Sequence, residues 1–195
     1  MEIVLLRHAQ TAGNLERRYI GVTDEPLCPE GKLAAVRSGV FPQVPLVYSS
    51  PMIRCVQTAT IKFPTARIIT SNHLREMDFG EFEGKTADEM IYDEVYQAWV
   101  DGGCVGRCPG GENRQQFVSR CCVAFSEIIG ENMRFGRRLV VIVAHGGTIM
   151  GIMERFARPG RQYFGWQVKN CGGFRAQLDE EIWSYSPQLV DVSRI

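Results

Sequence analysis

Two histidines follow directly on the two most apolar stretches of the chain. His8 comes after MEIVLLR, and His145 comes after LVVIVA. Arg7 precedes the first histidine, and Arg54 lies shortly after a third apolar stretch, residues 46–48. Guanidinium groups match the geometry of phosphate oxygens, and a histidine whose attacking nitrogen is neutral is a competent nucleophile. These residue types favour phosphoryl transfer through a phosphohistidine, with arginines supplying the charge neutralisation that Mg²⁺ supplies elsewhere.

Two further features would complete such a site. Gly146 and Gly147 lead into a helical pattern, so free N–H groups at the start of a helix would face an anion. A general acid must also protonate the leaving oxygen. The segment LREMDFGEFEG offers four carboxyl groups, and spacing alone does not choose among them: Glu76, Asp78, Glu81 and Glu83.

Each of these residues alone has an ordinary structural interpretation. Either histidine could bond a backbone carbonyl at a strand end, and Arg54 could lie in solvent on an amphipathic helix. The third histidine, His73, lies in the polar run TSNHLRE and is expected at the surface. The interpretation as a site rests on a coincidence, because two of only three histidines follow the two strongest strand patterns.

The elements that must position these side chains follow from hydrophobic patterning. Apolar runs at residues 3–6, 46–48, 67–70 and 139–144 are typical of buried strands. Helical patterns lie between them, and this alternation predicts an α/β fold with a mostly parallel sheet. In such sheets, ligands bind beyond the carboxyl ends of the strands. We therefore expect the two histidines and the two arginines to converge on one rim.

Local signals predict where helices begin and how the sheet closes. Pro29 suits the first turn of one helix. In SSPMIRCVQTATIKF, Ser50 is suited to cap a second helix and Pro51 to start it. A third helix follows the glycine pair in TIMGIMERFA. The late segments GGFRAQLD and EIWSYSP are expected to form a closing hairpin at the sheet edge.

The middle of the chain, residues 84–134, has helical patterns but no strong strand. It contains DGGCVGRCPGGENRQ, whose five glycines in fifteen residues predict a mobile loop inside a helical insertion. Composition leaves open whether this loop is functional or a solvated connector. Three aromatic residues could stack on a flat base, although their helical spacing favours packing: Tyr92, Tyr96 and Trp99.

Length and composition predict one domain without metal or cofactor. The chain has 195 residues with 22 basic and 22 acidic side chains, so net charge gives no support for a nucleic-acid partner. No stretch approaches the roughly 20 apolar residues of a membrane span, and the N-terminus lacks signal-peptide features. We expect a cytoplasmic protein with a small-molecule phosphomonoester as its partner. The seven cysteines are expected to be mostly buried apolar residues, and oligomeric state stays open.

Four segments together resemble the histidine phosphatase superfamily, also called the phosphoglycerate mutase-like family. They are LLRHAQTAGN, YSSPMIRCVQTA, LREMDFGEFEG and VVIVAHGGTI, in the order of that family, from residue 3 to about residue 150. The resemblance implies a three-layer α/β/α sandwich over residues 1–195, with the 84–134 insertion forming a partial lid. It also implies a phosphatase or mutase that works through a phosphohistidine.

The resemblance assigns roles residue by residue. It implies that His8 is the nucleophile, that Glu76 is the preferred proton donor, and that Arg7, Arg54 and His145 form the phosphate pocket. It also implies that Thr11 and Asn14 help to line the pocket. The segment RRYIGVTDEPL resembles a substrate-facing loop of the family, which would place Ile20 and Gly21 near the ligand.

The chain departs from the family pattern at two places. Ala9 stands where the family usually has glycine, which would be unfavourable if the backbone there required positive φ. Cys28 stands where threonine is frequent before a helix, and a cysteine is expected to cap less well.

The interval between Arg54 and Glu76 resembles the phosphatase branch more than the longer phosphoglycerate mutases. Three segments resemble α-ribazole-5′-phosphate phosphatases: LREMDFGEFEG, YQAWVDGG with PGGENRQQFVSR, and WQVKNCGGFRAQLD. Three alternatives stay open: a broad-specificity phosphatase, a phosphoglycerate mutase, and a domain that binds phospholigands without turnover.

Overall fold

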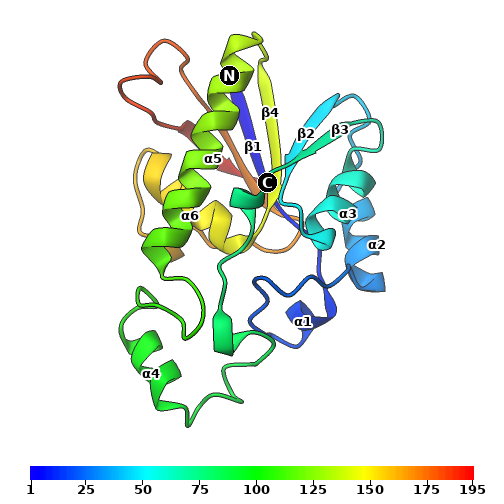
Figure 1. Cartoon of the computed structure of the whole chain (residues 1–195). Coiled ribbons are helices and arrows are strands. Elements are labelled where there is room, and N and C mark those ends of the chain that lie inside the picture. The colour runs from blue at the N-terminus through cyan, green and yellow to red at the C-terminus, as the bar shows by residue number, and fades with distance from the viewer.

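A six-stranded sheet runs through the middle of the molecule, with strand order β3-β2-β4-β1-β5-β6 (Figure 1). The computed structural model describes all residues from Met1 to Ile195. Four strands are parallel, and β5 and β6 are antiparallel at one edge. The strands are β1 (Glu2–Arg7), β2 (Leu46–Ser49), β3 (Arg67–Thr70), β4 (Leu139–Ala144), β5 (Gly173–Gln177) and β6 (Val190–Arg194). The four strands predicted from apolar runs are thus confirmed to within one residue at either end.

Helices cover both faces of this sheet, as Figure 1 shows. On one face lie α2 (Pro29–Arg37) and α3 (Ile53–Lys62), and on the other lie α5 (Arg114–Arg134) and α6 (Gly146–Phe156). Two short helices, α1 (Ala12–Leu15) and α4 (Glu94–Asp101), lie beyond the carboxyl ends of the parallel strands. None of the helices is long and apolar enough to cross a membrane.

The alternation of side chains along β1 explains the three layers. Ile3 and Leu5 belong to the large core shared with α5 and α6. Val4 and Leu6 belong to a second core shared with α3. A strand with both faces buried needs apolar residues at every position, which is what the run IVLL provides. The predicted three-layer α/β/α sandwich is therefore confirmed.

The start of α3 was predicted wrongly. The helix begins at Ile53 with Met52 at the capping position, so Ser50 and Pro51 precede it. The Ser50 hydroxyl instead lies 2.8 Å from Nε2 of His145. Met52 has no side-chain bond of its own to the helix start. The first helical N–H, of Ile53, instead donates to Oδ1 of Asp24 at 2.7 Å, and the Ser50 hydroxyl accepts from only one backbone N–H, that of Met52, at 3.4 Å.

The second half of the closing hairpin was also placed wrongly. GGFRAQLD does contain β5, but its antiparallel partner β6 lies further on, at Val190–Arg194. The segment EIWSYSP forms turns instead. Its Trp183 is buried in the large core and packs against Phe125 and Phe156, at ring-centroid distances of 5.9 and 5.4 Å. Burial of this indole in the core explains why the segment forms turns and does not form a strand of the sheet.

The expectation of an insertion over 84–134 is wrong for its second half. Phe117, Phe125 and Ile129 of α5 are fully buried in the large core, so α5 is one of the layers of the sandwich. The part that projects beyond the sheet comprises α4 and its flanking loops (Figure 1). The glycine-rich stretch between α4 and α5 forms no helix or strand, as predicted.

Candidate active site

The two histidines lie at the ends of neighbouring strands. β1 pairs with β4 in a register that sets Arg7 opposite Ala144, so the next residues of both strands emerge side by side. The backbone N–H of His8 donates to the carbonyl of Ala144 at 3.0 Å. The rings of His8 and His145 are 5.1 Å apart at an interplanar angle of 66°. The predicted convergence on one rim is confirmed for this pair.

The His8 ring has a defined tautomer. Its Nδ1 lies 2.7 Å from the carbonyl oxygen of Ala9. A carbonyl only accepts hydrogen bonds, so Nδ1 carries the proton and Nε2 of a neutral ring holds a free lone pair. Burial, together with the charges of Arg54 and Arg7, lowers the pKa of His8 well below its usual value. The ring is therefore neutral near pH 7 and suited to nucleophilic attack.

His145 is equally buried and lies where α6 begins. Its Nε2 is 2.8 Å from Oγ of Ser50, and the thiol of Cys55 lies 3.5 Å from the same nitrogen. Burial and the charge of Arg54 are the main causes that lower the pKa of His145 well below its usual value. An anion bound beside the ring would favour its protonated form.

Arg54 is a fully buried cation and Arg7 is a half-buried one, and neither has a carboxylate partner. Arg54 is fully buried and donates to the backbone carbonyls of Thr23 at 2.7 Å and Gly21 at 2.8 Å. Arg7 donates to the carbonyl of Val168 at 2.9 Å. Neither forms an ion pair, and the Nε of each is buried without a hydrogen-bond partner. Buried charges and buried N–H groups are unfavourable without partners, so this pair is arranged for an anion.

Glu76 is the candidate acid that lies in this site. Its two carboxyl oxygens accept from the backbone N–H groups of Met77 at 3.0 Å and Gly147 at 2.9 Å. These bonds and the nearby arginines favour the charged form, but burial outweighs them and raises the pKa of Glu76. A carboxyl group that keeps its proton at higher pH is suited to general acid catalysis.

The other three carboxyl groups of the segment have different roles. Asp78 accepts from the backbone N–H of Gly80 at 2.9 Å, and Glu81 is exposed. Glu83 accepts from the backbone N–H groups of three consecutive residues, at 3.0 to 3.3 Å: Gly21, Val22 and Thr23. Of the four carboxyl groups, only that of Glu76 lies at the site, and its function as the acid stays a prediction.

The loop held by Glu83 positions Arg54. Its N–H groups face the carboxylate, while the carbonyls of Gly21 and Thr23 accept from the Arg54 guanidinium. Glycine is required at position 21, because a Cβ atom there would lie 1.9 Å from the carbonyl oxygen of Met77. Sequence reasoning missed this function of Glu83, although the acidic residue was visible in the motif.

A cavity of about 990 Å³ opens beside these residues. Arg7, Glu76 and Gly146 line it, whereas His8, Arg54 and His145 are not among its lining residues. Aromatic side chains from distant segments form much of the remaining surface: Tyr19, Phe79, Trp99, Tyr163 and Phe164. The stretch 163–170 contributes six lining residues, and sequence reasoning had noted part of it only as a family resemblance, in WQVKNCGGFRAQLD.

The family model described as histidine phosphatase superfamily, branch 1, matches residues 3–186. The chain belongs to this superfamily. A phosphoglycerate mutase-like protein of Arabidopsis thaliana is 34% identical over 168 residues, which cover 81% of this chain and 71% of the relative. A probable phosphoglycerate mutase of Salmonella paratyphi B is 28% identical, with 99% of this chain and 92% of the relative covered.

Solved structures share the fold of this histidine phosphatase. A putative α-ribazole-5′-phosphate phosphatase of Escherichia coli has a TM-score of 0.79 at 22% identity, covering 93% of this chain and 92% of the other. The α-ribazole phosphatase of Shigella flexneri has a TM-score of 0.80 at 22% identity over the same shares.

The remaining residues that the family resemblance implied lie around the histidine phosphatase site but do not line the cavity. Thr11 is buried and caps α1, where its hydroxyl accepts from the N–H of Asn14 at 3.2 Å. Asn170 donates to Oδ1 of Asn14 at 3.1 Å and to the carbonyl of His8 at 3.0 Å. Ile20 precedes the loop that holds Arg54. Substrate contacts of Thr11, Asn14, Ile20 and Gly21 stay predictions.

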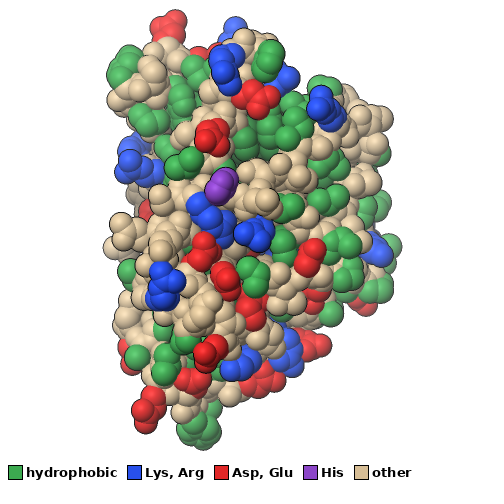
Figure 2. Space-filling view, viewed as in Figure 1, with side chains coloured by type: hydrophobic (Ala, Val, Ile, Leu, Met, Phe, Trp, Pro, Cys, Tyr) green, Lys and Arg blue, Asp and Glu red, His purple; other side chains and the backbone are tan.

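Both departures from the family pattern are accommodated. Ala9 does not adopt positive φ, so alanine carries no backbone penalty there. Cys28 caps α2, because its Sγ accepts from the N–H of Gly31 at 3.2 Å. Figure 2 shows acidic and basic side chains intermixed over the face in view.

Proposed function

We propose that this histidine phosphatase hydrolyses phosphomonoesters through a phosphohistidine at Nε2 of His8. The observation that carries the proposal is the pairing of a neutral, buried imidazole with two guanidinium groups that have no carboxylate partner and whose Nε groups are buried. A phosphate dianion would satisfy the free Nε donors of Arg7 and Arg54. It would also bring the phosphorus atom to Nε2 of His8, the nitrogen of that ring that holds a lone pair.

The reaction has two steps. In the first, Nε2 of His8 attacks phosphorus, the P–O ester bond breaks, and Glu76 gives its proton to the leaving alkoxide. In the second, Glu76 takes a proton from water, the water oxygen attacks phosphorus, and the N–P bond breaks. Inorganic phosphate leaves, and His8 regains its lone pair and Glu76 its proton.

The cavity favours a substrate with a flat apolar body, and we infer that α-ribazole 5′-phosphate is the candidate to test first. A volume of about 990 Å³ lies at the upper end of the range for small-molecule sites, roughly 300–1,000 Å³. Phosphoglycerate would fill little of it. Aromatic rings on two sides of the cavity suit a planar base. The solved structures of similar fold that are named for this substrate support the same choice.

Phosphoglycerate mutase activity is the second candidate, because the relatives found by sequence bear that name. In a mutase, the phosphohistidine returns its phosphate to a second alcohol instead of water. The chemistry at His8, Arg7 and Arg54 would be the same in both reactions, so the site geometry does not separate them.

The test is phosphate release from α-ribazole 5′-phosphate in the presence of EDTA, beside a panel of small phosphomonoesters. A strong preference for the ribazole compound supports the proposal in full. Similar rates on every ester support a broad-specificity phosphatase. Isomerisation of 3-phosphoglycerate without phosphate release supports the mutase, and no turnover of any compound would refute the catalytic proposal.

A further inference from the structure

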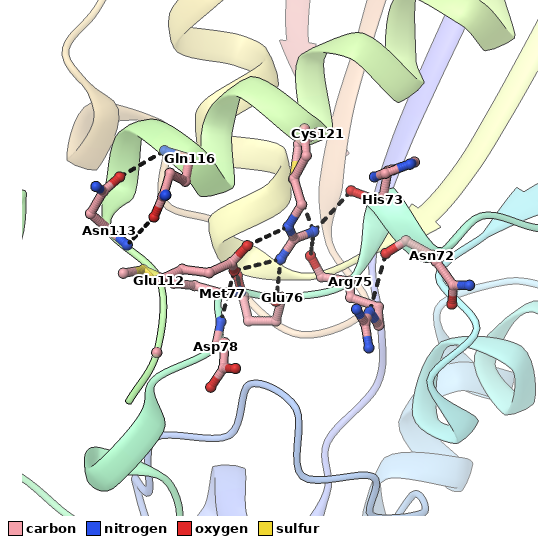
Figure 3. A network of polar contacts seen from close by, with 12 residues as sticks. Asn72, His73, Arg75, Glu76, Met77, Asp78, Glu112, Asn113, Gln116 and Cys121 are labelled. Carbon is pink, nitrogen blue, oxygen red and sulfur yellow. Dashed lines mark hydrogen bonds and ion pairs between the residues drawn. The ribbon is translucent and has the colours of Figure 1, made fainter. Parts of the chain in front are cut away.

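The segment that carries Glu76 has little regular structure of its own. A short 3₁₀ turn, η1 (Asn72–Leu74), ends just before it, and the next turn, η2, starts only at Gly80. Backbone groups outside helices and strands need other partners. Arg120 of α5 supplies them: its Nη1 donates to the carbonyls of His73 at 2.9 Å and Arg75 at 2.8 Å, and its Nη2 donates to the carbonyl of Glu76 at 2.8 Å (Figure 3).

Glu112 completes this arrangement from the other side. Its carboxylate accepts from Nε and Nη2 of Arg120, both at 2.8 Å. The same carboxylate accepts from the backbone N–H of Asp78 at 3.0 Å, and the Glu112 N–H donates to the Asp78 carbonyl at 2.9 Å. The segment 73–78 is thus held at both ends by one ion pair (Figure 3).

Every N–H group of the Arg120 side chain has an oxygen partner. The guanidinium has five donors, and it makes five bonds to oxygen, three to carbonyls and two to Glu112. The side chains of Arg120 and Glu112 are only 18% and 24% exposed. Burial opposes ionisation of Glu112, but the bonds from Arg120 and Asp78 lower its pKa, so the pair is charged. A lysine has no planar fork and cannot make these bonds together.

The ion pair of Arg120 and Glu112 contacts the segment that carries Glu76, and it does not contact the residues expected to bind phosphate. Neither Arg120 nor Glu112 lines the cavity. Arg7, His8 and Arg54 are held by other groups, as described above. Within Glu76, by contrast, Arg120 fixes the carbonyl, and the adjacent Met77 supplies one of the two N–H groups that hold the carboxyl. A shift of this segment would move the carboxyl relative to the leaving oxygen.

The geometry points to Arg120, with Glu112, as a positioning residue that sets the place of the Glu76 carboxyl for proton transfer to the leaving group. This inference rests on the proposed function, because it assigns the pair to one step of that reaction. It separates two functions in the first step of the reaction: Arg7 and Arg54 serve the phosphate of every substrate, whereas Arg120 serves only substrates whose leaving oxygen needs a proton.

The dependence on leaving group provides the test. p-Nitrophenyl phosphate releases a stable anion that needs no proton, whereas an alkyl ester releases an alkoxide that does. The quantity to compare is kcat/KM, because it reports formation of the phosphohistidine, whereas kcat also includes the second step, in which Glu76 acts on every substrate. For Arg120→Lys, we expect kcat/KM on the best alkyl substrate to fall roughly 10- to 100-fold, as for a catalytic group displaced by about 1 Å. We expect kcat/KM on p-nitrophenyl phosphate to change less than about threefold. Glu112→Gln is expected to show the same selectivity with a smaller effect.

The matched control is Arg134→Lys, at the exposed end of the same helix, which should leave both substrates unaffected. Thermal unfolding of each variant reports on folding. A second measurement adds Arg120→Lys to Glu76→Ala. If Arg120 acts through Glu76, the second change costs no further activity on the alkyl substrate.

The outcomes separate this inference from the proposed function. Equal losses of kcat/KM on both substrates, or a full additional loss in the Glu76→Ala background, would overturn the positioning function and leave a structural one. Unchanged activity in both Arg120→Lys and Glu112→Gln would also overturn it. A wild-type protein without turnover would instead refute the phosphatase proposal itself.

Discussion

The two ends of the cavity are built in different ways. At the phosphate end, Arg7 ends β1, His8 follows it and His145 follows β4, so paired strands fix their backbone. The opposite wall is the aromatic part of the lining, which comes from separate segments outside the sheet: Tyr19, Phe79, Trp99 and Phe164. The comparison indicates that the sheet positions the catalytic residues, while segments outside the sheet shape the cavity for the rest of the substrate.

Removal of the nucleophile should have the largest effect, and it should not depend on the substrate. For His8→Ala we expect turnover of every phosphomonoester to fall by roughly 10⁴-fold or more, because no other group can form the covalent intermediate. The measurement is phosphate release beside thermal unfolding, which should show a folded protein. A folded variant with substantial activity would exclude the phosphohistidine mechanism.

Arg54→Lys tests whether the phosphate end is shared by all substrates. A lysine loses the planar fork that donates to Gly21 and Thr23 while facing the anion. We expect kcat/KM to fall roughly 10²- to 10³-fold, the size typical of a lost oxyanion donor. The fall should be the same for α-ribazole 5′-phosphate and for p-nitrophenyl phosphate. Unequal falls would mean that Arg54 also contacts the body of the substrate.

The pH dependence of stability should originate at the phosphate end. The pKa of His8 is lower in the folded protein than in the unfolded chain, so the unfolded state binds more protons below about pH 6.5. Folding stability contributed by this group is therefore lost as pH falls, by up to about 1.4 kcal/mol per pH unit for one proton.

The raised pKa of Glu76 acts in the opposite direction, because the folded state then binds its proton more readily. The informative measurement is therefore a difference: chemical unfolding of wild type and His8→Asn between pH 5 and pH 8. We expect the variant to lose less stability on acidification. Phe164→Ala, at the opposite wall, should retain the wild-type slope, and identical slopes in all three proteins would contradict the assignment.

The smallest effect on activity should come from a substitution at the opposite wall, and it should depend on the body of the substrate. Phe164 is 47% exposed and lines the cavity, so its removal costs little core packing. For Phe164→Ala we expect KM for a substrate with a flat aromatic body to rise roughly 2- to 12-fold, the value of one aromatic contact. Steady-state kinetics on glycerol 2-phosphate should show no change. A general loss would show that this wall also supports the catalytic residues.

The phosphate end was predictable because its geometry follows from strand order. Once Arg7, His8 and His145 are placed after parallel strands, pairing of β1 with β4 leaves them few other positions. Glu76 could not be chosen from spacing, because only the fold shows that its carboxyl reaches the N–H of Gly147. The prediction that Ser50 caps a helix failed for a similar reason, because its hydroxyl contacts His145, which lies 95 positions away in the sequence.

The opposite wall could not be predicted, because its residues meet only through long-range packing. Trp99 and Tyr96 do pack, as their helical spacing indicates, and the Tyr96 hydroxyl lies 2.9 Å from that of Tyr19. Trp99 nevertheless also faces the cavity, while Tyr92 is 95% exposed. Periodicity separates buried from exposed positions, but it does not say which buried ring borders a ligand space.

Hydrogen bonds from a late part of the chain hold the end of the first strand, and this has a consequence for synthesis of the protein on the ribosome. Arg7 donates to the carbonyl of Val168, and Asn170 donates to the carbonyl of His8, across 161 and 162 positions. A ribosome adds about 5–20 residues per second. The nucleophile is therefore made first but waits roughly ten to thirty seconds for the groups that orient it. A chain that ends between His145 and Val168 therefore carries every reacting side chain and still lacks the bonds that arrange them.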